Sequence, residues 1–221
     1  MAKRIFLALL VLTLAAGGAF AQLSAGIGGN FAVSWDSSTY TSSNYTSTGT
    51  SSTPGGGFYA FFDATYVEVD VGLLFGGNTT THVTVSEGTA PDDSVWEANS
   101  SYLTLALYGK YPIDLGGFIL SPMLGIQYDI GLSVKDNDGN EWELEASDKA
   151  DFMNKFWVKL GVGADINISD SIYLRPSVLY GINFGTKMAN DSRDEVNKQD
   201  GMTQTDFNSG LDIRVALGFK F

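Results

Sequence analysis

The sequence predicts an all-β protein, an eight-stranded antiparallel up-and-down transmembrane β-barrel. Three observations lead to this fold class. Apolar and polar residues alternate with a period of two in successive segments, which is typical of strands with two unlike faces. The connections between these segments alternate between short and long, as in a barrel whose two termini lie on one side. The apolar face is also too bulky to fill the interior of a narrow barrel, so we expect it to point outward.

The first 21 residues have the pattern of a cleaved signal peptide. Lys3 and Arg4 give a positive start, residues 5–14 form an apolar stretch too short to cross a bilayer, and residues 19–21 place small side chains before Gln22. We therefore expect a mature barrel formed by residues 22–221. The chain has no cysteine, which excludes a disulfide scaffold and any cysteine-based zinc or redox site.

Eight segments are expected to be strands. Their ranges are 23–35, 57–64, 67–75, 102–111, 118–132, 156–168, 172–184 and 207–221. The first and the last alternate most regularly. Segment 57–64 carries aromatic residues on both faces, so the sequence leaves open which of its side chains point inward.

The connections fall into two groups. Three are short, at residues 63–66, 112–117 and 169–170, and four are long and polar, at 36–54, 76–99, 133–155 and 186–206. The first long connection is rich in Ser and Thr, and we expect it to be a mobile loop. The four long connections hold 17 acidic and 6 basic residues, so one end of the barrel should be acidic.

The polar face of the strands carries as many acidic as basic residues. An unpaired charge inside a closed barrel costs several kcal/mol, about 3–5 when a partner is removed, so this balance predicts a luminal network of ion pairs. Small residues on the same face, mostly Gly, would leave room for it. The predicted network consists of Glu68, Asp70, Asp129, Asp165 and Asp212 with Lys110, Lys159, Arg175, Arg214 and Lys220.

The apolar face shows two further features. Aromatic residues gather near the strand ends, where amphipathic rings meet the two membrane interfaces: Trp35, Phe75, Phe156 and Phe207 toward the long connections, and Tyr111, Phe118, Phe219 and Phe221 toward the short ones. Pro122 and Pro176 lie on the same face and lack the N–H that a strand donates, so we expect a β-bulge beside each.

The last strand, residues 211–221, ends in Phe221 and has apolar residues at every second position before it. It resembles the C-terminal strand that the bacterial outer-membrane assembly machinery reads, and Leu217, Phe219 and Phe221 are the residues that carry this signal. The whole mature chain is similar in architecture to the small eight-stranded outer-membrane superfamily. That superfamily includes the transmembrane domain of outer-membrane protein A, the opacity-type adhesins and the OmpW-like barrels. The resemblance implies the bacterial outer membrane as the compartment, with outer-membrane lipid and the assembly machinery as partners.

Three functions follow from this resemblance. The first is a non-enzymatic barrel with a largely plugged polar lumen, whose long acidic loops provide surface structure or contact a surface ligand. The second is a narrow channel for small molecules, hydrophobic ones included, and the many luminal glycines favour it. The third is an outer-membrane hydrolase that uses His82, the single histidine, with Thr84, Ser86 and the pair Asp92-Asp93 near it. No Gly-x-Ser-x-Gly motif accompanies this histidine, so we rank the enzyme last.

Cofactor and metal sites are not expected. Residues 136–141 contain an Asp-Asn-Asp-Gly run, but the EF-hand pattern requires Gly at position six and Glu at position twelve, where this chain has Glu141 and Ser147. A tight Asp-Gly turn explains the run better. The net charge of −12 argues against a nucleic-acid partner, because phosphate binding needs a clustered basic surface.

Overall fold

The structure is a computed structural model that describes residues 22–43, 46–77, 79–85, 99–136, 138–143 and 145–221. For residues 80–85 it describes the backbone alone. The expected signal peptide, residues 1–21, lies outside the described residues, so its cleavage stays a prediction.

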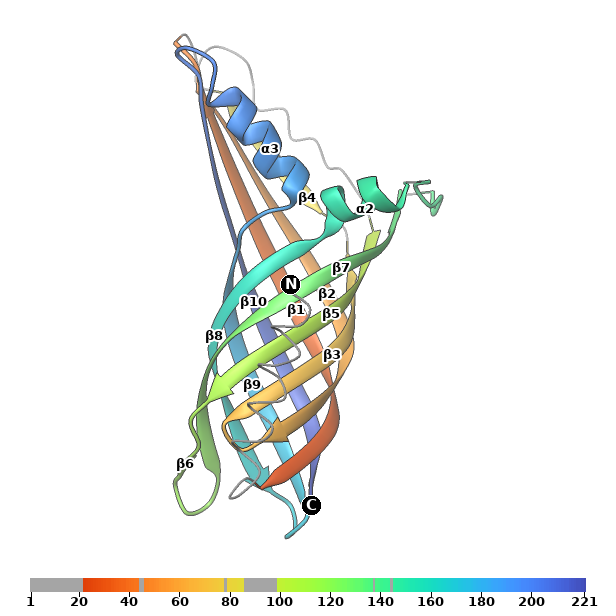
Figure 1. Cartoon of the computed structure of the whole chain (residues 1–221), viewed down its shortest axis with the longest axis vertical. Helices are drawn as coiled ribbons and strands as arrows, with labels where there is room; N and C mark the ends of the chain where they lie inside the picture. Colours follow the sequence, from red (N-terminus) through yellow and green to blue (C-terminus); the bar gives the residue numbers. More distant parts are fainter. Residues whose placement is uncertain (1–21, 44–45, 78, 86–98, 137, 144) are drawn as a thin grey trace, which may run out of the picture.

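Eight long antiparallel strands close into a barrel (Figure 1). In chain order they are β1 (Leu23–Thr41), β2 (Thr46–Ala64), β3 (Val67–Gly76), β5 (Asn99–Lys110), β7 (Ile119–Lys135), β8 (Lys155–Asn167), β9 (Ile172–Asn183) and β10 (Thr203–Lys220). Each strand pairs with the next in this order, and β1 also pairs with β10, which closes the ring. The predicted fold class is confirmed. Closure leaves no open sheet edge, so the backbone groups of the ring are paired within the protein, as a lipid environment requires.

One end of the barrel carries the short connections, and we call it the short-turn end. Residues 65–66 join β2 to β3, and residues 168–171 join β8 to β9. The hairpin between β5 and β7 contains the two-residue strand β6 (Ile113–Asp114), which pairs with β7. The first and last strands of the ring meet at this end, where the Phe221 N–H donates to the Leu23 carbonyl at 2.9 Å.

The opposite end, which we call the long-loop end, is more regular than expected. Residues 36–41 and 46–54 are strand and not a mobile loop, because β1 and β2 stay paired without a break from Leu23–Ala64 to Thr41–Thr46. The short strand β4 (Thr80–Val85) adds to the same extension by pairing with β2. The loop prediction was wrong because a Ser/Thr-rich composition suggested mobility, whereas β-branched threonines suit an extended backbone once a ladder runs past the barrel rim.

Two helices complete the long-loop end, α2 (Ala146–Met153) and α3 (Lys187–Val196). Figure 1 shows α3 beside the extension formed by β1, β2 and β10. The ammonium of Lys187 in α3 donates to Asp151 of α2 at 3.0 Å and to Asp191 at 2.9 Å, so it links the two helices. These two carboxylates, with the hydrogen bond to Asp191 first, raise the pKa of Lys187. None of the helices in the described ranges is long and apolar enough to cross a bilayer.

The connection after β7 begins with the expected tight turn. The carboxylate of Asp136 accepts from the backbone N–H groups of Asp138 (3.0 Å) and Asn140 (2.9 Å), and Gly139 has a positive φ of 83°. These hydrogen bonds, that of Asn140 first, lower the pKa of Asp136. The carboxylate therefore stabilises its own turn, as Asp commonly does in such positions.

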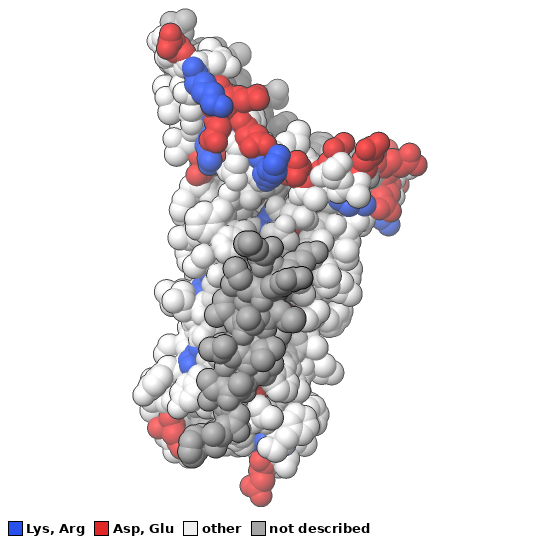
Figure 2. Space-filling model, in the orientation of Figure 1, with Lys and Arg blue, Asp and Glu red and all other residues white. Residues whose placement is uncertain are grey.

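The apolar face of the barrel points outward. Ile27 is 67% exposed and Leu160 is 63% exposed, and all eight aromatic residues predicted at the strand ends are exposed as well. Figure 2 shows charged side chains at the two ends of the molecule and few between them, over the area that the described residues cover. A contiguous apolar belt of this kind suits contact with lipid.

The structure settles two points that the sequence left open or placed wrongly. In β2, Tyr59, Phe61 and Asp63 are buried in the barrel and their neighbours face outward. No bulge accompanies either proline, since the register is the same on both sides of Pro122 and of Pro176. Between β8 and β9 the ladder loses pairs opposite Pro176 and gains no residue, so the missing N–H is accommodated without an insertion. The register shift among the described pairs lies elsewhere, between β5 and β7.

Candidate functional site in the barrel lumen

Five charged residues cross the lumen near the short-turn end, and we call them the lower network. They are Asp63 on β2, Glu68 on β3, Lys110 on β5, Asp165 on β8 and Arg175 on β9, and each is at most 8% exposed. The guanidinium of Arg175 donates to all three carboxylates, with distances of 2.6 Å to Asp63 and 2.8 Å from Nη2 to Asp165. Lys110 pairs with Asp63 and lies 3.9 Å from Glu68. The lower network therefore ties five of the eight strands together across the bore.

Aromatic rings fill the space around this network. The guanidinium carbon of Arg175 lies 4.9 Å from the ring centroid of Phe61 and 5.0 Å from that of Tyr173. The hydroxyl of Tyr173 is 2.8 Å from the Ser24 hydroxyl. These rings fit because glycine stands opposite them: a Cβ on Gly218 would collide with the ring of Tyr173. Gly218 thus makes room for a large side chain.

A second cluster, the upper network, lies one layer closer to the long-loop end. It consists of Asp70 on β3, Tyr108 on β5, Lys159 on β8, and Asp212 and Arg214 on β10. Arg214 donates to Asp70 at 2.7 Å and to the Tyr108 hydroxyl at 3.1 Å. Lys159 pairs with Asp212, which also lies 3.4 Å from Arg214. All five residues are buried, so the bore is occupied at this level too.

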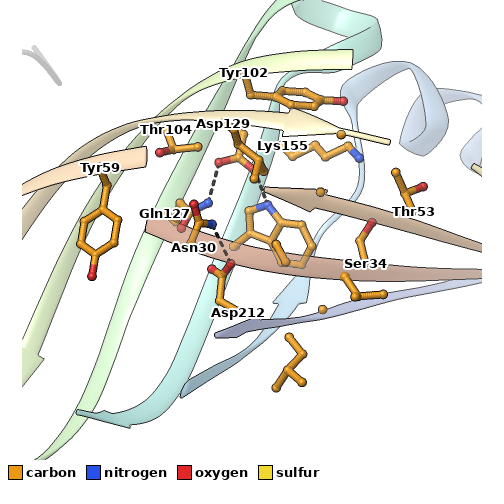
Figure 3. A pocket seen from close by; sticks show the side chains of 18 of the residues that line it. Asn30, Ser34, Thr53, Tyr59, Tyr102, Thr104, Gln127, Asp129, Lys155 and Asp212 are labelled. Carbon is orange, nitrogen blue, oxygen red and sulfur yellow. Dashed lines mark hydrogen bonds between the residues drawn. The ribbon is translucent and has the colours of Figure 1, made fainter. Parts of the chain in front are cut away.

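Beyond the upper network the lumen opens into a cavity of about 130 Å³. Asp70 and Trp157 are among its lining residues. So are Asn30, Gln127, Asp129 and Asp212, which are labelled in Figure 3. Asp129 accepts hydrogen bonds from the Gln127 amide and from the Trp157 indole, both at 2.7 Å. A wider chamber of about 410 Å³ follows toward the long-loop end, and Tyr102 and Lys155 line both spaces.

The comparison with protein families assigns the chain. The model of the outer membrane protein β-barrel domain matches residues 6–219. The chain belongs to this family. The barrel therefore lies in the bacterial outer membrane, and its long-loop end is the extracellular end, because outer-membrane barrels have short periplasmic turns and longer extracellular loops.

Solved structures that resemble this outer-membrane barrel share little sequence with it. Neisserial surface protein A is 11% identical over 87% of this chain and 97% of its own, with a TM-score of 0.41. OprG from Pseudomonas aeruginosa is 16% identical over 91% of this chain and 97% of its own, with a TM-score of 0.44. Ail, the attachment invasion locus protein of Yersinia pestis, is 12% identical over 89% and 99%, with a TM-score of 0.32. The comparison with curated proteins gives no match.

Nine of the ten residues predicted for the luminal network are buried in the barrel. Eight of them form the lower and upper networks, and the ninth, Asp129, lines the cavity. Lys220 belongs to neither network: its ammonium donates to Asn167 at 2.6 Å at the periplasmic rim. Lys220 differs from the other nine because it lies near the end of the last strand. The alternation of the strand shows which face a side chain is on, but not how deep in the bore it lies.

Sequence reasoning missed Asp63, which contacts both cations of the lower network. It was placed in a turn because the parity of the segment before it stayed open. The expected balance of five acidic and five basic residues therefore does not hold. Within the described residues, six acidic side chains and four basic ones are buried. Asp63 and Glu68 are acidic residues on either side of the same short turn, and this placement could have indicated Asp63 as a further member of the network.

The residues of the predicted assembly signal do not line the lumen. Leu217, Phe219 and Phe221 face outward on the last strand, and their reading by the assembly machinery stays a prediction. His82 belongs to β4 in the extracellular extension, where its backbone pairs with Thr50, and its side chain lies outside the described part. Ser86, Asp92 and Asp93 lie outside the described residues as well.

Proposed function

We propose that this outer-membrane barrel is a closed, non-enzymatic surface protein that acts through its extracellular end. Its partners in this proposal are the outer-membrane lipid around its apolar belt, the assembly machinery that reads Leu217, Phe219 and Phe221, and a surface ligand bound by the extracellular segments. The lower network is the observation that carries the proposal, because it closes the bore on the periplasmic side of the cavity.

The chemistry of the lower network argues against conduction. A solute that crossed it would have to displace Arg175 from three buried carboxylates, and separating such a pair leaves charges without compensation. The rings of Phe61 and Tyr173 stand close to the same guanidinium, so the side chain has no obvious space into which to swing. The lower network is therefore expected to act as a permanent plug.

The extracellular end supplies what a contact surface needs. The long pairing of β1 with β2 and with β10 builds an ordered extension, and α2 and α3 are joined by Lys187. Most of the acidic excess of the chain lies in the segments of this end. We expect a partner with basic groups, because a field of one sign attracts the opposite charge and speeds association.

Single-channel recording in planar lipid bilayers tests the closed lumen. The refolded barrel is expected to give no discrete conductance steps, and an Arg175→Ala variant with Glu68→Gln should give small ones because the plug is then incomplete. A Lys187→Ala variant, altered on the surface only, is the matched control and should stay silent. Clear steps from the unaltered barrel would favour the alternative function, a narrow channel for small molecules.

A deletion tests the role of the extracellular end. Removing residues 136–151 should leave membrane insertion and heat-modifiable gel mobility intact and should change a surface phenotype, such as adhesion to a basic protein layer. Loss of insertion would show that the segment is structural and would contradict its role in contact. A hydrolase activity that disappears in His82→Ala would contradict the non-enzymatic part of the proposal.

A further inference from the structure

We propose that the luminal cavity beyond the upper network binds a small organic ammonium ion, which enters from the extracellular end and is held by Asp129. This inference does not depend on the surface-contact function. A ligand bound in the cavity leaves the lower network intact, so the barrel can bind the ion without conducting it.

The first argument is the charge of Asp129. Its side chain is 3% exposed, and both of its hydrogen bonds come from neutral donors, the amide of Gln127 and the indole of Trp157. Lys155 stands directly opposite it in the register of β7 and β8, yet these two residues form no ion pair. The ammonium of Lys155 lies 5.6 Å from the ring centroid of Tyr102 instead. Within the described residues, Asp129 therefore forms no direct ion pair, although Lys159 and Lys155 act on it electrostatically from a greater distance.

Two of the three cations that line the cavity are already paired. Arg214 pairs with Asp70, and Lys159 pairs with Asp212. Asp129 is the carboxylate of the cavity lining that has no direct ion pair, and burying a carboxylate without one is costly. A second signal comes from Asp70, whose Oδ1 is buried without a hydrogen-bond partner although the residue lines the same cavity. An ammonium group supplies both a positive charge and several N–H donors.

The walls and the volume of the cavity indicate an organic ion. Tyr59, Tyr102 and Trp157 line it, and aromatic rings attract organic cations. Its volume of about 130 Å³ is similar to that of a cavity of roughly 150 Å³ known to take up benzene. Among the described residues no group of three or more acidic, His or Cys side chains is placed to hold a metal ion, so a divalent cation would lack its usual oxygen ligands.

The route into the cavity favours a cation. The wider extracellular chamber shares Tyr102 and Lys155 with the cavity, and its lining includes Asp36 and Asp206. The chamber lining thus holds two carboxylates and one cation, Lys155, and the surrounding extracellular segments are acidic overall, so the local field favours the entry of cations. The ion would pass this acidic mouth before it reaches Asp129.

Benzylammonium is the probe for the test. The full barrel is refolded in an alkyl maltoside, because amine-oxide and choline-type detergents would themselves offer an ammonium group. The indole N–H of Trp157, assigned with a Trp157→Phe variant, reports on the site in ¹H–¹⁵N spectra because it donates to Asp129. We expect a saturable shift of this signal with benzylammonium and none with benzyl alcohol or benzoate.

The Asp129→Asn variant should weaken binding about tenfold or more, as expected for the loss of a hydrogen bond to a charged group. Asp165→Asn, which removes the same charge in the lower network, is the matched control and should keep the affinity. Equal binding of benzylammonium and benzyl alcohol by the unaltered barrel would overturn the proposal even if Asp129→Asn does not fold. The absence of any saturable shift would overturn it as well. So would complete displacement of benzylammonium by NaCl.

Discussion

Replacing Arg175 with Met is the most direct test of the lower network. The substitution removes one cation and leaves Asp63, Glu68 and Asp165 with Lys110 as their remaining partner. All three carboxylates are at most 8% exposed, so water does not readily replace the guanidinium. Breaking a buried ion pair costs about 3–5 kcal/mol, and lost contacts with the two aromatic rings add about 1 kcal/mol. We therefore expect the free energy of unfolding to fall by about 4 kcal/mol or more.

The measurement is equilibrium unfolding in urea, with the barrel in lipid vesicles and tryptophan fluorescence as the signal. The denaturant midpoint should fall while the slope of the transition stays the same, because the surface exposed on unfolding hardly changes. Adding Glu68→Gln and Asp165→Asn to Arg175→Met should recover a large part of the loss, since fewer buried charges then lack a partner. Lys187→Met, which breaks exposed ion pairs, is the control and should change little. A loss below about 1 kcal/mol for Arg175→Met would show that water fills the bore and would refute the plug.

Three further predictions concern other parts of the chain. Gly218→Val should destabilise the barrel by about 1–3 kcal/mol in the same assay because its Cβ meets a buried ring, whereas Gly29→Ala, whose nearest neighbour is 3.6 Å away, should be tolerated. The turn held by Asp136 should stay formed above the ordinary carboxyl pKa and open as the pH falls through its lowered pKa, which the amide shift of Asn140 in a pH titration reports. Removing Phe221 should reduce assembly into the outer membrane in cells without preventing refolding in detergent, and unchanged surface levels would contradict its role as a signal.

The barrel was predictable because short-range patterns in the sequence determine the strands and their order. A period of two reports which side of a strand meets lipid, and the spacing of turns reports the order of the strands. The two terminal strands show this best. Ile27 and Phe219 are exposed, whereas residues of the opposite face, such as Ser24, Asp212 and Arg214, are buried. In the same way, the Asp-Gly run after β7 was read correctly as a turn, because the carboxylate of Asp136 bonds within its own few residues.

The luminal site was only partly predictable because it depends on which side chains meet across the bore. Alternation places Arg175 and Glu68 inside, but it does not show that one guanidinium reaches three carboxylates on three other strands. Asp63 was missed for a related reason: aromatic residues on both faces of its strand hid the parity. The extension formed by residues 36–41 and 46–54 was missed because strand pairing, with each other and with β10, orders these residues although their own composition does not indicate it.

The two networks and the cavity also divide the lumen into regions with different constraints. In the lower network every cation contacts at least two carboxylates, so each substitution there leaves several charges unpaired. In the cavity, by contrast, Asp129 accepts hydrogen bonds from neutral donors alone and lines open space. A barrel that needed only a stable core would gain by placing Lys155 on the carboxylate directly opposite it, since the β7–β8 register already brings them together. In the structure the Lys155 ammonium lies over the ring of Tyr102 instead, which leaves the hydrogen bonds of Asp129 to neutral donors and agrees with the proposed binding of an ammonium ligand there.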